Sequence, residues 1–543
     1  MPLAEQKRAV AWLAWGGYLL TAAVLATLIL LQGDVQFGGE DGGILTHTAW
    51  QLLHGYLPYR DVAASGLPPI FLIGSHLAFA LFGVQWHSFV MFTALFSVVT
   101  LLFQLSLLER LPFGRVWAWS IAVLTQCLTL VPISWWWFNQ ATAVAACLFA
   151  TAALVFTRNP RDRYAQVAFT LTAALLMLGK ANVAGLLIVL VGLICLRARE
   201  LRWRMLAGYA VAGLLVLGVF AASHIALPDL LASYRLAGHR VFSPRVFLDC
   251  FWRNDQWEVE KTFLALVPAV IALGITLVQK QKDLVAISAV HSSDQRTTPA
   301  TTAMLANNPV LAISAAAIVV GFVAMGTNND LNQVELPGVL LGISVIVLTL
   351  ADSWPATLRT QLRVLLAISF AALLVFGLYI GQQRLRVRAI GMRAYYEDAP
   401  LTRLTTPPFF AGVAVAPRFT RVLAQTRSLL SANGYLGHPH APVYFGPRLL
   451  FNYAAFGLEP VPGIPLWWQL YKDKIPQTKE KVQLFQTAQY EMAIFIHRDY
   501  IFYPKSLCDY LNSEYDVVDW GELTVHFRRH AGRKFVLPAL PKP

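Results

Sequence analysis

The chain has 543 residues, of which 57% are hydrophobic and 13% are charged. A soluble globular protein carries about 25% charged residues, so the composition excludes a chain that is soluble throughout. The formal net charge of +13 does not indicate a nucleic-acid-binding protein, because no basic module stands apart from the hydrophobic blocks.

The apolar residues fall in blocks of about 20, the length at which a helix crosses a bilayer. We therefore predict an all-α polytopic membrane protein with about 11 transmembrane helices and a small C-terminal α/β soluble domain. The first block is longer than the apolar core of a signal peptide and is interpreted as a retained span. The predicted spans are 10–32, 86–108, 115–132, 136–157, 164–181, 183–197, 205–226, 262–278, 309–326, 336–351 and 364–382.

Basic residues define the orientation of these spans. Lys7 and Arg8 precede the first span, and the Lys and Arg residues of the later connections gather in alternate ones. By the positive-inside rule the N-terminus is cytoplasmic, and an odd number of spans leaves the C-terminal domain outside. We interpret the chain as an integral protein of the bacterial plasma (inner) membrane.

The chain divides into a transmembrane module, 1–394, and an extracytoplasmic α/β domain, 395–543. The long connections are a first external loop at 33–85, a second at 227–261 and a Ser/Thr-rich cytoplasmic linker at 283–308. In the α/β domain we expect a helix at 417–432 and strands at 441–446, 492–497, 515–520 and 523–529, the last two forming a hairpin.

The first external loop carries the most informative pattern, GGEDGGILTHTAWQLLHGYLPYRDVAASGLPPIFLIGSHLAFALFG. Residues 43–54 have helical apolar spacing and stop at Gly55, and a second apolar helix runs from Pro68-Pro69 to Phe82-Gly83. We expect two amphipathic helices half-inserted in the outer membrane face. Asp41 lies at the start of the first, where helix-end amides and the macrodipole favour a carboxylate.

This loop resembles the GT-C superfamily of membrane glycosyltransferases, and within it the branch of the protein O-mannosyltransferases and the aminoarabinose lipid A transferase. The shared features are a carboxylate after the first span, the motif A-x-x-L-L-x-G-x-x-P-Y-x-D, a Pro-Pro pair and a helix ending in Phe-Gly. A weaker similarity is the stretch Leu178-Gly179-Lys180-Ala181-Asn182 near the end of a span. The matching residues of the loop are Asp41, Ala49, Leu52, Leu53, Gly55, Pro58, Tyr59, Asp61, Pro68, Pro69, Phe82 and Gly83.

The resemblance implies an inverting transfer of a sugar from a polyprenyl-phosphate donor to a lipid, glycan or protein acceptor at the extracytoplasmic membrane face. Asp41 aligns with the catalytic aspartate of the first loop, which acts as general base or orients the acceptor, and Glu40 lies beside it. The implied partners are the donor, the acceptor and the membrane. We assign no cofactor, and leave open a divalent cation held by Glu40, Asp41 and Asp61.

Such a transfer has chemical requirements of its own. A carboxylate can accept the proton of the attacking nucleophile, and a cation must stabilise the departing phosphate. The candidates for binding the donor phosphate are Lys180, Arg235, Arg240, Arg245 and Arg60. Further candidate pocket residues are Asp61, Tyr59, His239 and Asn139.

Three features depart from the branch. The first-loop acid is commonly followed by Glu, whereas Asp41 is followed by Gly42 and preceded by Glu40. Ser65-Gly66-Leu67 stands where a lysine usually precedes the Pro-Pro pair. Asn139 stands where the branch often has a second acid at the start of its fourth span. These departures concern the handling of the acceptor and the choice of base more than the fold.

Each candidate also has a plain structural interpretation. Glu40 and Asp41 could cap a surface helix, Arg60 and Asp61 could pair within a turn, and Lys180 could extend its stem to the interface. The remaining alternatives are headgroup binding by Arg235, Arg240 and Arg245, a structural His239, an interfacial aromatic belt of Trp135, Trp136 and Trp137, and core packing rather than acceptor stacking for Tyr444, Arg448, Trp467 and Trp468.

Two other functions stay open at this point. One is a transporter or flippase of lipid-linked sugars, a class that typically places ionisable groups or broken helices at mid-membrane. The cores of the predicted spans are nearly free of Asp, Glu, Lys and Arg, which disfavours transport. The other is a non-catalytic envelope assembly factor.

Overall fold

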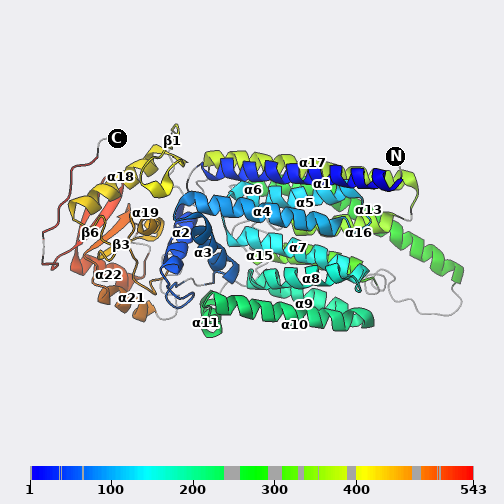
Figure 1. The fold of residues 1–543 in the computed structure, drawn as a ribbon, viewed down its shortest axis with the longest axis horizontal. Helices are drawn as coiled ribbons and strands as arrows, with labels where there is room; N and C mark the ends of the chain where they lie inside the picture. The colour runs from blue at the N-terminus through cyan, green and yellow to red at the C-terminus, as the bar shows by residue number, and fades with distance from the viewer. Residues whose placement is uncertain are drawn as a thin grey trace.

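The computed structural model describes residues 3–35, 37, 39–63, 66–237, 257–291, 308–327, 336–352, 354–387, 399–466, 478–497, 499, 503–532 and 534–541. A bundle of long helices forms one end of the molecule and an α/β unit forms the other (Figure 1). Two helices of the first external loop, α2 (Gly39–Leu53) and α3 (Pro69–Phe82), lie between them.

Each predicted span contains a helix. Among the described residues, seven helices are long and apolar enough to cross a membrane by length and composition, and α9, α15 and α16 are shorter apolar helices. The polytopic helical fold is therefore confirmed, whereas the number of eleven spans stays a prediction. The bundle consists of α1 (Leu3–Gly33), α4 (Trp86–Leu108), α5 (Arg115–Leu128), α6 (Leu130–Ile133), α7 (Phe138–Arg158), α8 (Arg163–Met177), α9 (Ala181–Arg197), α10 (Arg199–Ala222), α13 (Trp257–His291), α15 (Pro309–Thr327), α16 (Leu336–Ala351) and α17 (Ala356–Val387).

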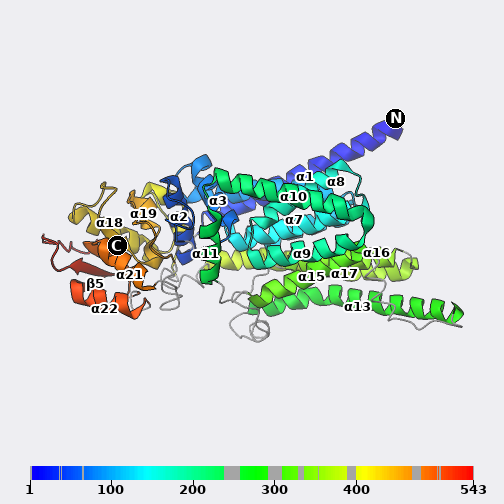
Figure 2. The same cartoon turned by 90° about the horizontal axis from the view of Figure 1, so that it is seen from below.

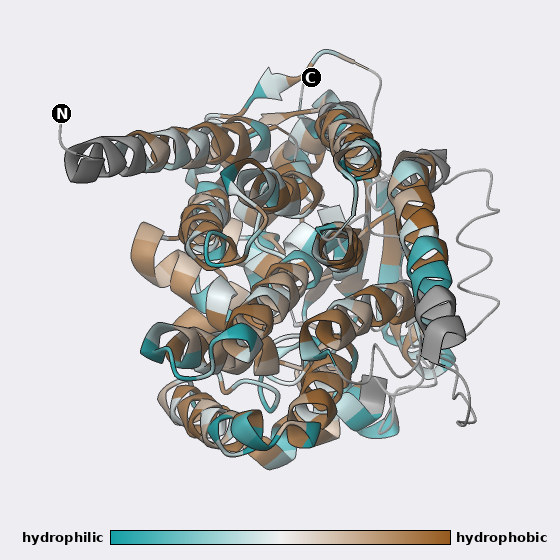
Figure 3. Ribbon diagram, turned by 90° about the vertical axis from the view of Figure 1, so that its right-hand side faces the viewer, coloured by the Kyte–Doolittle hydropathy of each residue, from teal (hydrophilic) through white to brown (hydrophobic). Residues whose placement is uncertain are grey.

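Hydrophobic residues predominate in the helices of the bundle, as the ribbon coloured by hydropathy shows end-on (Figure 3). Helix α13 lies on the outside of the bundle beside α17 (Figure 2). Charged residues of two connections meet at the end where α1 begins, remote from the α/β unit (Figure 1). There Arg110 contacts Asp162 at 2.5 Å, and Glu109 binds both Arg115 at 3.2 Å and the hydroxyl of Tyr18 at 2.7 Å. This is the end predicted to be cytoplasmic.

Helix α3 has its predicted limits, whereas α2 begins at Gly39 rather than at residue 43. Pro69 occupies the first turn of α3, where its missing N–H is not needed. Gly83 ends α3 with φ of 86°, and its N–H binds Phe79 O at 2.9 Å. Helix α2 begins at Gly39, so the acids of the loop lie in its first turn.

The surroundings of the loop differ from the prediction in one respect. The side chains of Trp135, Trp136 and Trp137 are 6%, 2% and 6% exposed, so they form no lipid-facing belt. The indole N–H of Trp136 donates to Phe71 O at 3.3 Å, and the ring packs on Gly74. Helix α3 covers these rings, which local hydropathy does not reveal.

Two of the predicted connections are partly helical. Helix α13 continues through His291 into the predicted linker 283–308, whose residues 292–307 lie outside the described part of the chain. The second external loop contains α11 (Leu227–Ala237) and, from Trp257, the start of α13.

The α/β unit has the predicted helix, α18 (Pro417–Ala432), and the four predicted strands. The strand order is β3-β4-β6-β5. Strand β3 is parallel to β4, β6 is antiparallel to β4, and β5 pairs with β6 in an antiparallel hairpin. The carboxyl ends of β3 and β4 therefore share one edge of the sheet. The elements of the unit are β1 (Thr402–Arg403), η2 (Pro408–Phe410), β2 (Ala414–Val415), α18, β3 (Val443–Phe445), η3 (Pro447–Leu449), α19 (Asn452–Phe456), α21 (Thr478–Thr487), β4 (Met492–Ile496), α22 (Lys505–Glu514), β5 (Tyr515–Trp520) and β6 (Leu523–Arg528).

The first loop binds this unit directly. The indole N–H of Trp50 donates to Leu458 O at 2.7 Å, and the Tyr56 hydroxyl donates to Pro460 O at 2.8 Å. Ahead of α2, the ring of Phe37 packs against rings of the unit, among them Phe410 and Phe451. Helix α2 is consequently covered by the α/β unit on one face and by α3 on another.

Candidate functional site

The two predicted acids differ in their surroundings. Glu40 is partly buried and Asp41 is exposed. Gly43 lies on the same helical face as Glu40, and a Cβ added there would meet Pro447 O at 3.7 Å and Leu450 Cβ at 3.8 Å. Glu40 therefore faces the α/β unit, while Asp41 is rotated about 100° from it around the helix.

Opposite Glu40, the α/β unit presents Arg448 and Asp499. Arg448 belongs to η3 and Asp499 follows β4, so both lie at the carboxyl edge of the parallel strands. Arg448 Nη1 is 3.4 Å from Asp499 Oδ1. Burial raises the pKa of Asp499 to about 6; the charge of Arg448 opposes this rise and the charge of Glu40 adds to it. Glu40 in the first turn of α2 therefore acts electrostatically on Asp499 at the edge of the sheet.

Lys180 and Asn139, both predicted from the sequence, come together. Lys180 Nζ lies 3.5 Å from Asn139 Oδ1, and its backbone N–H donates to Thr142 Oγ1 at 3.1 Å. Ile70 N–H donates to Leu178 O at 2.8 Å. The starts of α3, α7 and α9 therefore meet at Lys180, on the side of the bundle that faces the α/β unit (Figure 1).

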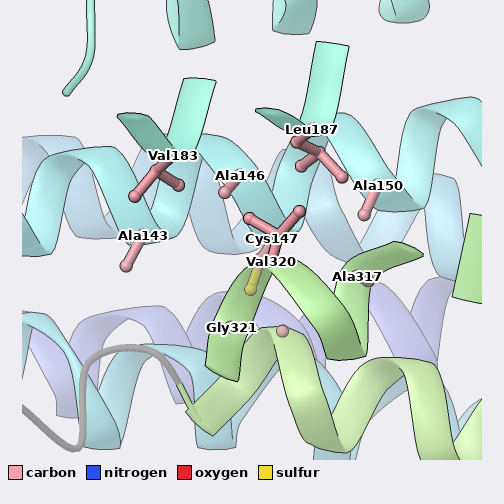
Figure 4. A pocket seen from close by; sticks show the side chains of 10 residues that line it. Ala143, Ala146, Cys147, Ala150, Val183, Leu187, Ala317, Val320 and Gly321 are labelled. Carbon is pink, nitrogen blue, oxygen red and sulfur yellow. The ribbon is translucent and has the colours of Figure 1, made fainter. Parts of the chain in front are cut away.

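An apolar groove begins one helical turn beyond this pair. Ala143 and Cys147 follow Asn139 along one face of α7, and Val183 and Leu187 follow Lys180 on α9. Helices α15 and α16 complete the walls (Figure 4). The groove has a volume of about 20 Å³ and is partly open to the surroundings, and apart from the Cys147 thiol its side chains are small or aliphatic. A cation thus lies near one end of this apolar groove.

Three of the candidate residues lie in the turn after α2 and make contacts within it. Asp61 Oδ2 accepts the N–H of Leu57 at 2.9 Å and Oδ1 lies 3.6 Å from Arg60 Nε. The Arg60 side chain is 62% exposed. The buried Tyr59 donates its hydroxyl to Leu67 O at 2.9 Å, and burial raises the pKa of that phenol. These contacts favour the structural interpretation of Arg60, Asp61 and Tyr59.

Helix α11 packs on the same turn. Ser233 Oγ accepts the N–H of Gly66 at 3.0 Å, within the segment that replaces the lysine of the related branch. Arg235 is exposed on this helix. His239, Arg240 and Arg245 lie outside the described residues, so their roles in binding the donor phosphate stay predictions.

The predicted base and the predicted phosphate-binding lysine are not adjacent. A Cβ at Gly42 would touch the Trp86 ring at 3.3 Å, and Trp86 opens α4 just after α3 ends, so Asp41 lies beside the C-terminal end of α3. Lys180 lies beside its N-terminal end. The 14 residues of α3 extend roughly 20 Å, which is therefore the approximate distance between the two halves of the predicted site.

No group of three or more His, Cys, Asp or Glu residues in the described part of the chain is arranged to hold a metal ion. The divalent cation considered for Glu40, Asp41 and Asp61 gains no support, because Asp61 is bound within its own turn. Sequence reasoning missed Asp499 and the groove. The signal available for Asp499 was its position directly after the strand MAIFI, where parallel strands often present ligand-binding residues.

Solved structures similar to this chain over most of its length include two of one protein. ArnT from Cupriavidus metallidurans in the apo state has a TM-score of 0.50 and 14% sequence identity, covering 96% of this chain and 98% of that one. The same protein bound to undecaprenyl phosphate gives a TM-score of 0.47 at 14% identity, covering 95% and 98%. No protein-family model and no curated protein sequence matches the chain.

At this identity the likeness to the apo structure concerns the fold alone. ArnT is the aminoarabinose lipid A transferase and has the GT-C fold. The GT-C architecture expected from the first-loop motif is thereby confirmed, from α1 to the α/β unit.

Proposed function

We propose that this protein is a GT-C-type membrane glycosyltransferase that takes a sugar from a polyprenyl-phosphate donor. The fold supports the general class, because it is the fold of ArnT. The other ArnT structure contains undecaprenyl phosphate, a lipid of the donor-carrier class predicted from the sequence. The observation that carries the proposal is the apolar groove with Lys180 and Asn139 near its end.

The groove and the lysine match the two parts of such a carrier. An isoprenoid chain gains free energy by leaving water for apolar walls, and the small side chains of Ala143, Ala146 and Ala150 form one such wall. A phosphate needs a nearby cation, which Lys180 supplies. Asn139 replaces the acid of the related branch, so the side chain at position 139 that contacts Lys180 carries no negative charge.

In this proposal Asp41 is the base that accepts the proton of the acceptor hydroxyl while the phosphate departs with inversion at the anomeric carbon. That carbon is bonded to a phosphate oxygen, so base and phosphate must act within a few ångströms of each other. Because α3 separates Asp41 from Lys180, the proposal requires that substrate binding brings the first turn of α2 towards Lys180. Asp41 is exposed, so such a substrate can reach its carboxylate.

A transporter or flippase of lipid-linked sugars is the second candidate, and the groove alone would also suit it. The separate α/β unit, fixed to the first loop by Trp50 and Tyr56, instead favours an enzyme whose acceptor binds outside the bilayer. A non-catalytic assembly factor would need neither the lysine nor the groove.

Sugar transfer by the purified protein is the decisive assay. Proteoliposomes with undecaprenyl-phosphate-linked sugars and an envelope extract should yield a labelled acceptor. Asp41→Asn should reduce transfer at least ~100-fold, the lower end of the range for loss of a general base, without changing undecaprenyl phosphate binding. Asp352→Asn, an exposed acid at the other end of the bundle, is the matched control. Flux of the donor across the membrane without transfer would instead identify a flippase.

A further inference from the structure

The junction between α2 and the α/β unit holds polar groups that donor binding does not use. His47 and Asn452 are 3% and 0% exposed. His47 Nδ1 and both amide atoms of Asn452 have no hydrogen-bond partner among the described residues. The His47 ring centre is 5.0 Å from that of Tyr453, the residue after Asn452. Polar atoms buried without partners are rare in folded proteins, so this junction is suited to a further polar ligand.

Asp499 adds a carboxylate to the same junction. It is 7% exposed, and its Oδ2 has no hydrogen-bond partner in the described part of the chain. Its neighbour Arg448 is 34% exposed at the side chain, so the guanidinium lies nearer the surface than the carboxylate. Both are at the carboxyl edge of β3 and β4, the edge at which ligands bind in open parallel sheets.

The donors and acceptors define the kind of ligand. A phosphate requires donors only, and an apolar group requires neither. Here Arg448 donates, Glu40 and Asp499 accept, and Asn452 can do both. Neighbouring sugar hydroxyls, each a donor and an acceptor, satisfy such a mixed set.

We propose that this junction binds a sugar-containing acceptor, with Arg448 and Asp499 binding its hydroxyl groups and Glu40 facing them from α2. The proposal rests on the proposed function, because it assigns the acceptor of that transfer to the glycan class. The exposed Asp41 follows Glu40 about 100° further around the first turn of α2, so an acceptor held here lies within one helical turn of the predicted base. The bound acceptor then lies near the C-terminal end of α3, whereas the carrier site at Lys180 lies near the N-terminal end of the same helix.

Saturation-transfer NMR on the protein in nanodiscs tests this proposal. Nanodiscs avoid maltoside detergents, whose sugar headgroups would compete with the disaccharide probes. The probes are maltose, lactose and N,N′-diacetylchitobiose, with radiolabelled undecaprenyl phosphate as a separate ligand. Asp499→Asn and Arg448→Gln should weaken disaccharide binding at least tenfold and leave undecaprenyl phosphate binding unchanged. Arg529→Gln is the control, since Arg529 pairs with Asp516 at 2.9 Å at the opposite edge of the same sheet.

The outcomes separate this inference from the proposed function. Absence of undecaprenyl phosphate binding to the wild-type protein refutes the donor proposal, whereas normal carrier binding without disaccharide binding refutes the acceptor site alone. Equal losses in Asp499→Asn and Arg529→Gln also overturn the acceptor site. Thermal unfolding at pH 7.5 distinguishes a structural role, because Asp499→Asn should lower disaccharide binding without lowering Tm.

Discussion

The protonation of Asp499 affects both the proposed acceptor site and the stability of the folded protein. Burial raises its pKa from 3.8 to about 6, so the folded protein binds this proton more tightly than the unfolded chain. Stability therefore decreases as the pH rises from about 4 through 6, by on the order of 2–3 kcal/mol at neutral pH. Among the described residues, the charged groups that act on it are Glu40 on α2 and Arg448 on η3, with the Tyr503 phenol also close to it.

Asp499→Asn should consequently stabilise the protein more at pH 7.5 than at pH 5, because the amide removes a buried charge present only at the higher pH. Thermal unfolding of both proteins at the two pH values measures this difference. A larger loss of stability at pH 7.5 would mean that the ion pair with Arg448 outweighs the burial of the charge.

Lys180 is the residue on which carrier binding depends. Lys180→Met keeps an unbranched stem over Phe138 but removes the charge, so the affinity for undecaprenyl phosphate should fall about 10- to 100-fold, the range expected for a charge-assisted hydrogen bond. A filter-binding assay with labelled lipid measures it. Lys282→Met, an exposed lysine at the far end of the bundle, should bind like the wild type.

Among the elements, α3 depends on close contact with the tryptophans beneath it. A Cβ at Gly74 would lie 2.2 Å from the Trp136 ring, so Gly74→Ala should destabilise the protein by about 1–3 kcal/mol through overpacking. Gly185→Ala on α9 meets nothing within 4 Å and should be neutral or slightly stabilising. Thermal unfolding of fluorescent fusions compares the two, and equal Tm values would show that α3 does not pack as described.

The groove between α7 and α9 gives an element-scale prediction as well. Ala146→Phe should fill it and lower undecaprenyl phosphate affinity at least tenfold, while sparing the disaccharide binding expected at the α/β unit. Ala210→Phe, on an exposed face of α10, controls for the added ring. Unchanged lipid binding in a well-folded Ala146→Phe variant would exclude the groove as the carrier site.

At the scale of the whole molecule, the sequence predicted most features that depend on local pattern. Gly55, Pro69 and Gly83 mark the limits of α2 and α3 because each suits a helix end for its own backbone reason. The strands of the α/β unit were recognisable from their apolar runs and the turn at Gly521. The first-loop motif gave the GT-C fold, which the ArnT likeness confirms.

Features that depend on distant parts of the chain were not predictable in this way. In the sequence, Trp136 is an apolar residue next to a predicted span. This pattern is the same whether its ring faces lipid or lies beneath α3. Asp499 meets Glu40 only because the sheet edge packs on α2, across more than 400 residues of chain. The distance between Asp41 and Lys180 likewise follows from the direction of α3, which composition does not specify.

A cryo-electron microscopy structure with undecaprenyl phosphate in nanodiscs tests the central claim most directly. The account predicts a phosphate within hydrogen-bond distance of Lys180 Nζ, with the first isoprene units between α7 and α9 beside Cys147. A phosphate bound elsewhere, with the groove closed by its own side chains, would contradict the assignment of this groove to the donor lipid.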